Sequence, residues 1–169
     1  MKRTVIKDLP QYLNQEVKVS GFVNARRDHG KLIFLDLRDQ SGKIQMVSQP
    51  QNKKAYELAD QLRPEWVAEV VGKVNKRPEK MINEAEANGH LELEISEIKI
   101  LSKAETPPFD IYGEGKEINE EMRMKFRYLD LRRPRMQKNL QARHKVIKFL
   151  RDYLDSRGFL EVETPILTQ

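Results

Sequence analysis

Five stretches of the chain alternate apolar and polar residues with a period of two, and this alternation constrains the fold more strongly than any other feature. A period of two is typical of a β-strand that buries one of its faces. The stretches are residues 16–27, 31–38, 43–48, 66–75 and 90–101. Between the third and the fourth, residues 52–62 have helical spacing, with Ala55, Leu58, Ala59 and Leu62 on one face. The sequence therefore predicts three strands, a helix and two further strands.

This order of elements is that of a five-stranded OB-fold barrel, in which the helix lies between strands three and four. A small SH3-like barrel or a split sheet would also accommodate five strands, but the position of the helix favours the OB-fold. We therefore expect a mainly β domain over residues 1–103. Turns are expected at residues 28–31, where Gly30 can adopt a positive φ, and at residues 40–42.

Residues 104–137 are expected to form a hinge. Their first part, residues 104–118, contains two prolines and two glycines, and residues 127–134 are compact and basic. Helical spacing returns over residues 138–157, and Gly158 is placed at the C′ position to end that helix.

The last residues of the chain predict only the beginning of another domain. Residues 159–163 can form a short strand, which Pro165 would break. No further element follows, so we expect residues 138–169 to be the start of an α+β domain and the chain to be a piece of a longer protein.

Charge and composition narrow the function classes. The net charge of +5 is a mild indication of an anionic partner. Residues 122–151 contain eleven lysines and arginines and a single acid, Asp130, so this stretch forms either a solvated basic face or a phosphate-contacting surface. The absence of cysteine excludes disulfides, thiolate catalysis and cysteine-ligated zinc, and His29, His90 and His144 lack metal-ligand spacing.

No stretch approaches the roughly 20 apolar residues needed to span a bilayer, and the first ten residues lack the apolar run of a signal peptide. We therefore expect no membrane partner and a cytoplasmic location.

Phe34 is the aromatic residue whose position in its strand points to a binding role. Ile33, Leu35 and Leu37 share the core face of their strand, so Phe34 faces the other way, beside Asp36. Either the hinge or a loop covers this ring, or the ring is a stacking platform for an unpaired base, which is the usual way single-stranded nucleic acid is held.

Polar residues on neighbouring strands suit the second interpretation. Gln45 faces away from the core, and its amide can both donate to and accept from a base edge. Glu92 also faces away from the core and can accept from exocyclic amines, although for either residue alone a solvated strand face is the commoner situation. Arg26, Arg27 and Arg77 lie at strand ends, where guanidinium groups can neutralise phosphates or stack on bases.

Three segments resemble one family, the bacterial aspartyl-tRNA synthetases. RRDHGKLIFLDLRDQSGKIQ (residues 26–45) is similar to their anticodon-binding barrel, and KAETPPF (residues 103–109) is similar to the entry of their hinge. RYLDLRRPRMQKNLQARHKVIKFLRDYLDSRGFLEVETPIL (residues 127–167) resembles the entry into their class II catalytic domain. RYLDLR alone would also fit the lysine and asparagine relatives, but the first and third segments together are specific.

The resemblance implies roles for individual residues in tRNA binding. Phe34 would stack on the middle anticodon base and Gln45 would hydrogen-bond to it. Arg27 and Glu92 would flank the anticodon, with Glu92 near the first base, and Arg26 and Arg77 would complete the tRNA-binding set. One departure is Ala25, where many relatives carry a basic residue, which puts one phosphate contact in doubt.

The resemblance also implies a homodimeric parent enzyme. The family's dimer-forming motif 1 is a long helix followed by a strand that ends in proline, and here Gly158 and Pro165 would occupy its turn and its end. The family couples aspartate to ATP with magnesium and passes the aspartyl group to tRNA. Those residues lie in later motifs, so we expect this chain to hold no cofactor or catalytic residue and to be inert alone.

A free-standing OB module that binds nucleic acid without enzymatic activity is the alternative. Residues 138–167 argue against it, because such a module has no use for a helix and strand that bury nothing of their own.

His29 bears on tRNA specificity. The resemblance implies that leucine at this position accompanies strict recognition of aspartate tRNA, whereas histidine accompanies enzymes that also charge asparagine tRNA. His29 is otherwise a turn residue that faces water.

Overall fold

The computed structural model describes residues 1–164, which form two compact units, Met1–Thr106 and the unit that begins at Pro107. In the described residues, no helix is long and apolar enough to cross a membrane.

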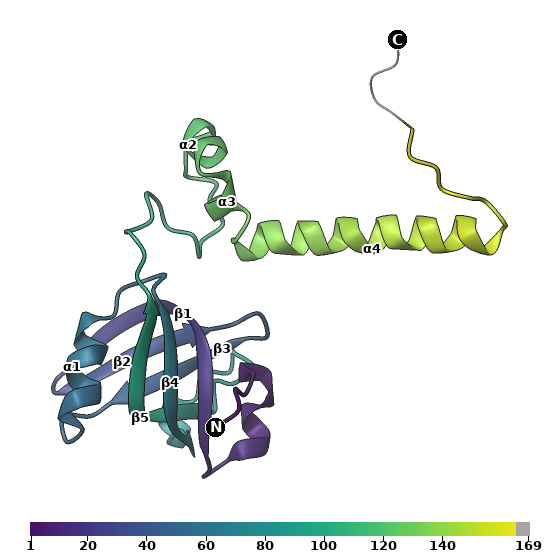
Figure 1. Cartoon of the computed structure of the whole chain (residues 1–169). Coiled ribbons are helices and arrows are strands. Elements are labelled where there is room, and N and C mark those ends of the chain that lie inside the picture. Colours follow the sequence, from purple (N-terminus) through teal and green to yellow (C-terminus); the bar gives the residue numbers. More distant parts are fainter. Residues whose placement is uncertain (165–169) are drawn as a thin grey trace. The chain divides into compact units, whose positions relative to one another are not determined.

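The first unit is a closed five-stranded barrel with strand order β1-β2-β3-β5-β4, and β4 returns to pair with β1 (Figure 1). Neighbouring strands are antiparallel except β3 and β5, which are parallel. The strands are β1 (Glu16–His29), β2 (Leu32–Arg38), β3 (Lys43–Ser48), β4 (Val67–Lys76) and β5 (Leu91–Ser102). Helix α1 (Lys53–Gln61) lies between β3 and β4 in the chain, which confirms the predicted OB-fold order.

Alternate residues of every strand fill the interior of the barrel. Val19, Leu35, Met46, Val70 and Leu93 are fully buried there, and Ala55 and Ala59 of α1 pack onto the same core. Because the interior of a small barrel is filled by side chains, whatever this unit binds must meet its outer surface or its loops.

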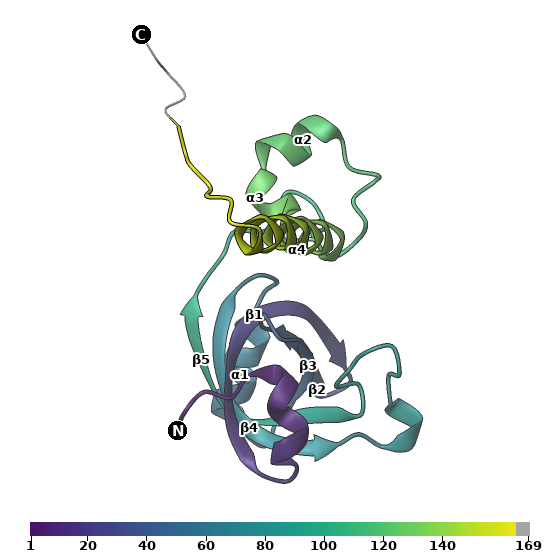
Figure 2. The same ribbon diagram turned by 90° about the vertical axis from the view of Figure 1, so that its right-hand side faces the viewer.

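A short 3-10 helix, η1 (Ile6–Tyr12), lies beside the barrel and was not predicted from the sequence (Figure 2). Ile6 and Leu9 are fully buried in the barrel core, and burying each such side chain stabilises the fold by about 1.5–3 kcal/mol. Asp39 holds this helix to the β2–β3 turn, because its carboxylate accepts from the backbone N–H of Ile6 at 3.0 Å and from Ser41.

A β-bulge interrupts the pairing of β1 with β2. Val23 lies opposite Leu37, but the next paired residue, Ala25, lies opposite Asp36, so Asn24 is the extra residue. Residues after the bulge therefore have the opposite orientation from the one that simple alternation gives. As a result, Arg27 and not Arg26 shares a face with Phe34.

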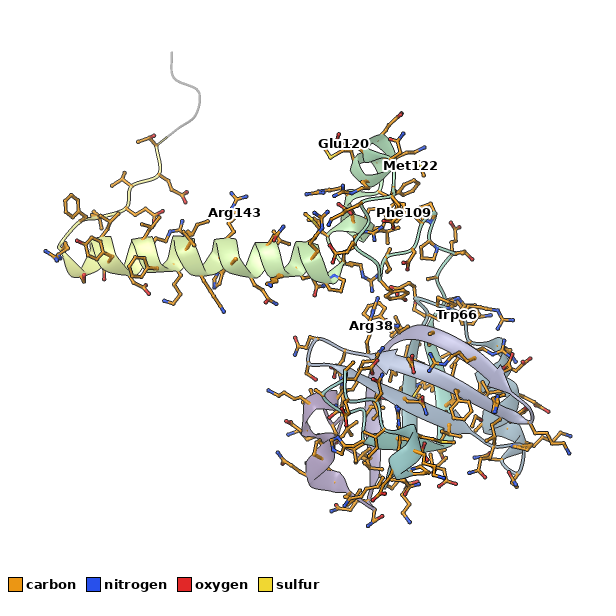
Figure 3. All side chains as sticks on the ribbon, turned by 180° about the vertical axis from the view of Figure 1, so that it is seen from behind. Arg38, Trp66, Phe109, Glu120, Met122 and Arg143 are labelled. Atoms are coloured by element: carbon orange, nitrogen blue, oxygen red, sulfur yellow. The ribbon has the colours of Figure 1, made fainter. Side chains whose placement is uncertain are left out.

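The second unit contains α2 (Glu120–Lys125), α3 (Arg127–Asp130) and α4 (Pro134–Ser156). Asp130 is fully buried and accepts hydrogen bonds from Arg123 Nε at 3.1 Å, Arg127 Nη1 at 2.6 Å and Arg133 Nε at 3.1 Å. Part of the predicted hinge is thus an ordered cluster around one carboxylate, and the Arg133 guanidinium also lies 5.3 Å from the Phe109 ring centroid, a residue labelled in Figure 3.

Helix α4 begins four residues before the predicted start and ends as predicted at Gly158. Gly158 has a φ of +81°, its N–H donates to Asp155 O, and the N–H of Phe159 donates to Leu154 O, which is the Schellman pattern. Every side chain of residues 138–164 is exposed, and Arg143 in Figure 3 points into solvent.

The strand predicted at residues 159–163 is wrong, because residues 159–164 have no regular secondary structure. A strand needs a neighbour for its backbone N–H and C=O groups, and the described residues supply none there. Pro165, which was predicted to end this strand, lies outside the described residues.

Candidate nucleic-acid interface

Two rows of outward-facing residues cross the barrel and carry most of the predicted site. Their members are defined by strand register, one residue per strand in the order β1, β2, β3, β5, β4. The first row is Ala25, Asp36, Gln45, Glu92 and Asn75. The second row is Arg27, Phe34, Val47, Glu94 and Lys73. In OB-folds, strands two and three and the loops 1–2 and 4–5 form the surface that takes oligonucleotides.

Phe34 lies in the middle of this surface. Its neighbours in sequence, Ile33 and Leu35, point into the core, whereas Phe34 itself is half-buried on the outside, between Arg27 of β1 and Val47 of β3. Val47 is nearly buried, so one edge of the ring has an apolar neighbour. A partly exposed ring on a packed strand is a rigid platform on which a base can stack.

Arg27 is joined to Asp36 by two parallel hydrogen bonds. Its Nη1 donates to Asp36 Oδ2 at 2.9 Å and its Nη2 donates to Oδ1 at 2.8 Å. This hydrogen-bonded pairing raises the pKa of the Arg27 guanidinium, against the lowering effect of burial, and the charges of Asp36 and Glu86 raise it further. The Asp36 side chain is only 9% exposed, whereas that of Arg27 is 53% exposed.

Gln45 and Glu92 lie opposite each other on the parallel strands β3 and β5. Burial raises the pKa of the Glu92 carboxyl, the nearby Arg77 lowers it, and Glu94 raises it. Arg77 itself is held at the end of β4, because its Nε donates to Leu91 O at 2.9 Å. An amide and a carboxyl side by side can meet both donors and acceptors of a base edge.

Arg26 is not brought to this surface. It lies opposite the buried Leu35, and its Nη2 donates to Asp28 and, at 2.7 Å, to Asp60 of α1. These contacts tie β1 to the helix, so the structure gives Arg26 a role in holding α1 and leaves Arg27 as the arginine beside Phe34.

His29 is the last residue of β1 and has the same orientation as Arg27 and Phe34. It is exposed and directly precedes the loop Gly30–Lys31, in which Gly30 has a φ of +60°. The predicted four-residue turn is thus a two-residue hairpin loop, and a glycine with positive φ at its first position is typical of such turns.

The loop between β4 and β5, residues 77–90, approaches the same surface. Glu86 forms an ion pair with Lys43 of β3 at 2.7 Å. The loop is closed by a backbone hydrogen bond from the Asn83 N–H to Gly89 O at 3.1 Å, and a Cβ on Gly89 would lie 1.8 Å from Asn83 O. Glycine is therefore required for this loop to keep its shape.

Sequence reasoning missed two contributors to this surface, Asp36 and Glu86. Asp36 carried a detectable signal, because an aspartate on the outer face of a strand lies two residues from Phe34. Glu86 carried none, since the loop that contains it has no periodicity. Gly158 belongs to the second unit, and Pro165 lies outside the described residues.

Residues 1–164 contain no group of three or more histidine, cysteine or acidic side chains that could hold a metal ion.

Comparison with known families divides the chain as its structure does. Residues 17–101 match a family described as OB-fold nucleic acid binding domain, and residues 119–169 match a family described as tRNA synthetases class II (D, K and N).

Curated relatives share high sequence identity over most of the chain. It is 51% identical over 160 residues to an aspartate–tRNA(Asp/Asn) ligase of Halothermothrix orenii, and 46% identical over 157 residues to one of Legionella pneumophila. These alignments cover 94% and 93% of this chain. The chain spans about a quarter of the length of these relatives, 27% and 26%.

Solved structures show the same fold at low identity. An aspartyl-tRNA synthetase from Entamoeba histolytica matches 99% of this chain with a TM-score of 0.86 and 22% identity. An asparaginyl-tRNA synthetase from Pyrococcus horikoshii matches 98% with a TM-score of 0.79 and 23% identity. The chain covers 40% and 37% of those two proteins.

Proposed function

Because this chain belongs to the family of OB-fold nucleic acid binding domains and is related over 94% of its length to aspartate–tRNA ligases, we propose that it is the anticodon-binding part of an aspartate–tRNA ligase. The match of residues 119–169 to class II synthetases favours this over a free-standing OB module. The observation that carries the proposal is the half-buried Phe34 ring on the outer surface of β2, set among Arg27, Asp36 and Gln45.

In this function the anticodon loop lies across β2, β3 and β5. Its middle base stacks on Phe34 and hydrogen-bonds to the Gln45 amide, while Glu92 contacts the first base. Arg27 and Arg77 flank the loop and His29 borders its far end.

The parent enzyme attaches aspartate to tRNA in the cytoplasm with ATP and magnesium, and it does so as a homodimer in which α4, Gly158 and Pro165 belong to the dimer-forming segment. We assign ATP and magnesium to the part of the parent enzyme beyond the 27% of the relative's length that this chain matches. This chain alone is expected to be inert in ATP–pyrophosphate exchange with aspartate, and measurable exchange by a clean preparation contradicts that expectation.

The proposal is tested by measuring the affinity of the 169-residue chain for two RNA hairpins that share the same stem. One loop carries an anticodon that pairs with an aspartate codon, and the other carries the same three bases in a different order. We expect tighter binding to the first hairpin. Phe34→Ala should weaken it by about 1–3 kcal/mol, because base–aromatic stacking is lost.

Phe22→Ala is the matched control. Phe22 is another phenylalanine on the outside of the barrel, on β1 before the bulge, with the Arg38 guanidinium 5.2 Å from its ring centroid. We expect it to leave RNA affinity nearly unchanged. Equal affinity of the unaltered chain for both hairpins would reject the proposed function.

A further inference from the structure

Asp36 occupies an unusual position for an acidic residue on a surface proposed to meet RNA. It belongs to the same row as Gln45 and lies two residues along β2 from Phe34. Its side chain is almost fully covered, and among the described residues the hydrogen bonds to its carboxylate come from Arg27. A carboxylate repels phosphate, so its presence here is a cost to RNA affinity that calls for an explanation.

The geometry of the pair restricts what Arg27 can do. Arg27 lies opposite Phe34 in the register, but its guanidinium reaches diagonally to Asp36. Both Nη atoms take part, which fixes the plane of the guanidinium as well as its position. Three N–H groups remain, and two of them, the Nε–H and the outer Nη2–H, form a second parallel pair of donors on a side chain that is 53% exposed.

The pair also changes the electrostatic character of Arg27. A free arginine next to a stacked base would bind phosphate in any sequence, because phosphate contacts carry no sequence information. Asp36 compensates that charge and leaves directional donors. A guanidinium held in this way suits an acceptor pair on a base edge or two phosphate oxygens in one fixed place.

We infer that Asp36 is a positioning residue for anticodon recognition: it fixes the Arg27 guanidinium so that Arg27 recognises one geometry of the loop instead of attracting RNA in general. This inference rests on the proposed function, since it requires that the outer surface of β2 and β3 meets an anticodon loop. According to this inference, Asp36 raises selectivity for one anticodon loop and lowers affinity for RNA in general.

The test compares Asp36→Asn with the unaltered chain on the same two hairpins over a series of salt concentrations. Asparagine keeps the shape of the side chain but removes its charge. The ratio of affinities for the aspartate hairpin and the permuted hairpin should fall at least about fivefold, the loss expected for one bidentate contact. Affinity for the permuted hairpin should rise, and its dependence on salt should steepen by about 0.7 on a log–log plot, because Arg27 is freed to pair with one further phosphate.

Two further variants separate the positioning of Arg27 from the effect of net charge. Glu69→Gln also removes one negative charge. Glu69 of β4 forms an ion pair with Lys18 of β1 at 3.5 Å. We expect this variant to leave the affinity ratio unchanged. Arg27→Lys keeps the charge on an exposed side chain but loses the planar donor pair. It should lower the ratio as far as Asp36→Asn does, without raising affinity for the permuted hairpin.

Each outcome decides the inference. An unchanged ratio in Arg27→Lys overturns it, whatever Asp36→Asn does. The inference is also overturned if Asp36→Asn leaves the ratio of the two affinities unchanged, or if it weakens binding to both hairpins equally. If the unaltered chain binds both hairpins equally, the proposed function is rejected. That result comes from the unaltered chain alone, so it can be told apart from the results of the three variants.

Discussion

Gln45 and Glu92 lie opposite each other across the parallel pairing of β3 and β5, and both side chains face outward. This pairing is what brings a residue from the last strand of the barrel beside a residue from the third. It places a carboxyl group whose pKa is raised, first by burial, next to an amide that can donate and accept. The protonation state of Glu92 therefore bears on both binding and stability.

Glu92→Gln should remove a pH dependence from RNA binding. As pH falls through the raised pKa of Glu92, above its ordinary 4.5, the carboxylate becomes neutral, so repulsion of phosphate is lost and affinity for both hairpins rises. Glutamine is neutral at every pH, so the variant should show a flatter affinity profile between pH 4.5 and 7. Affinity measured by fluorescence anisotropy at several pH values tests this, and parallel profiles for the two proteins would refute it.

The same raised pKa predicts the sign of a stability effect. The folded state holds the Glu92 proton more tightly than the unfolded state, so its ionisation destabilises the fold as pH rises through 4.5 and the folded pKa. Glu92→Gln should therefore unfold at a higher denaturant concentration than the unaltered chain at neutral pH, and at a similar concentration below pH 4.5.

Leu35→Ala and Phe34→Ala form a matched pair of substitutions on opposite faces of β2. Leu35 is fully buried in the core, so its truncation should lower the free energy of unfolding by about 2–5 kcal/mol. Phe34 is half-buried on the outside, so its truncation should cost clearly less stability and act on RNA binding instead. Denaturant unfolding of both variants gives the comparison. Unfolding of the barrel by Phe34→Ala would show that the ring is a core residue.

The order of strands and helix along the chain and most strand positions could be predicted from the sequence, because inward residues such as Val19, Leu35 and Leu93 must alternate to fill a barrel. Strand β3 has the predicted bounds, Lys43–Ser48. The bulge at Asn24 could not be predicted, since an extra residue is visible only when both partner strands are known.

The hinge shows why composition is a weaker guide than periodicity. Proline, glycine and charge over residues 104–137 indicate a linker, yet Asp130 is buried there by three arginines that come from positions up to seven residues away. Such a cluster depends on side-chain geometry and not on spacing alone. Likewise, residues 159–163 have the composition of a strand but, in the described part of the chain, no neighbouring strand to pair with.

Asp130→Asn should loosen the cluster that α2 and α3 form. A hydrogen bond from Arg123 lowers the pKa of Asp130, burial opposes this, and the charges of Arg123, Arg127 and Arg133 lower it further. The ionised form is thus favoured in the folded state, so its contribution is present above pH 3.8 and is lost as pH falls through the lowered pKa. Hydrogen exchange of residues 120–133 should become faster in the variant at pH 7, while exchange in the barrel strands stays the same.

Helix α4 should cause the chain to self-associate. Leu140, Ile147, Leu150 and Leu154 are exposed at helical spacing, and Phe149 stacks on Tyr153 at 6.3 Å between ring centroids. An exposed apolar stripe of this kind favours association with another apolar surface. Sedimentation should show concentration-dependent association, which Leu150→Glu weakens. The control Lys138→Glu, on the opposite face of α4, should leave association in place. A monomer at all concentrations would contradict this prediction.

His29 should decide how strictly the parent enzyme distinguishes aspartate tRNA from asparagine tRNA. The β1 bulge turns His29 to the side of Arg27 and Phe34, at the edge of the hairpin loop that borders the proposed interface. The two tRNAs differ in the third anticodon base, cytosine in one and uracil in the other. These pyrimidines present a donor and an acceptor, respectively, at the same position of the ring.

A neutral imidazole carries one donor and one acceptor, so His29 can meet either pyrimidine, whereas leucine offers contact without a hydrogen bond. The parent enzyme should therefore aspartylate both tRNAs, and its His29→Leu variant should lose activity on asparagine tRNA more than on aspartate tRNA. Initial rates with the two purified tRNAs measure this ratio. An equal ratio in both proteins would dismiss His29 as the determinant, and rejection of asparagine tRNA by the unaltered parent would dismiss relaxed specificity altogether.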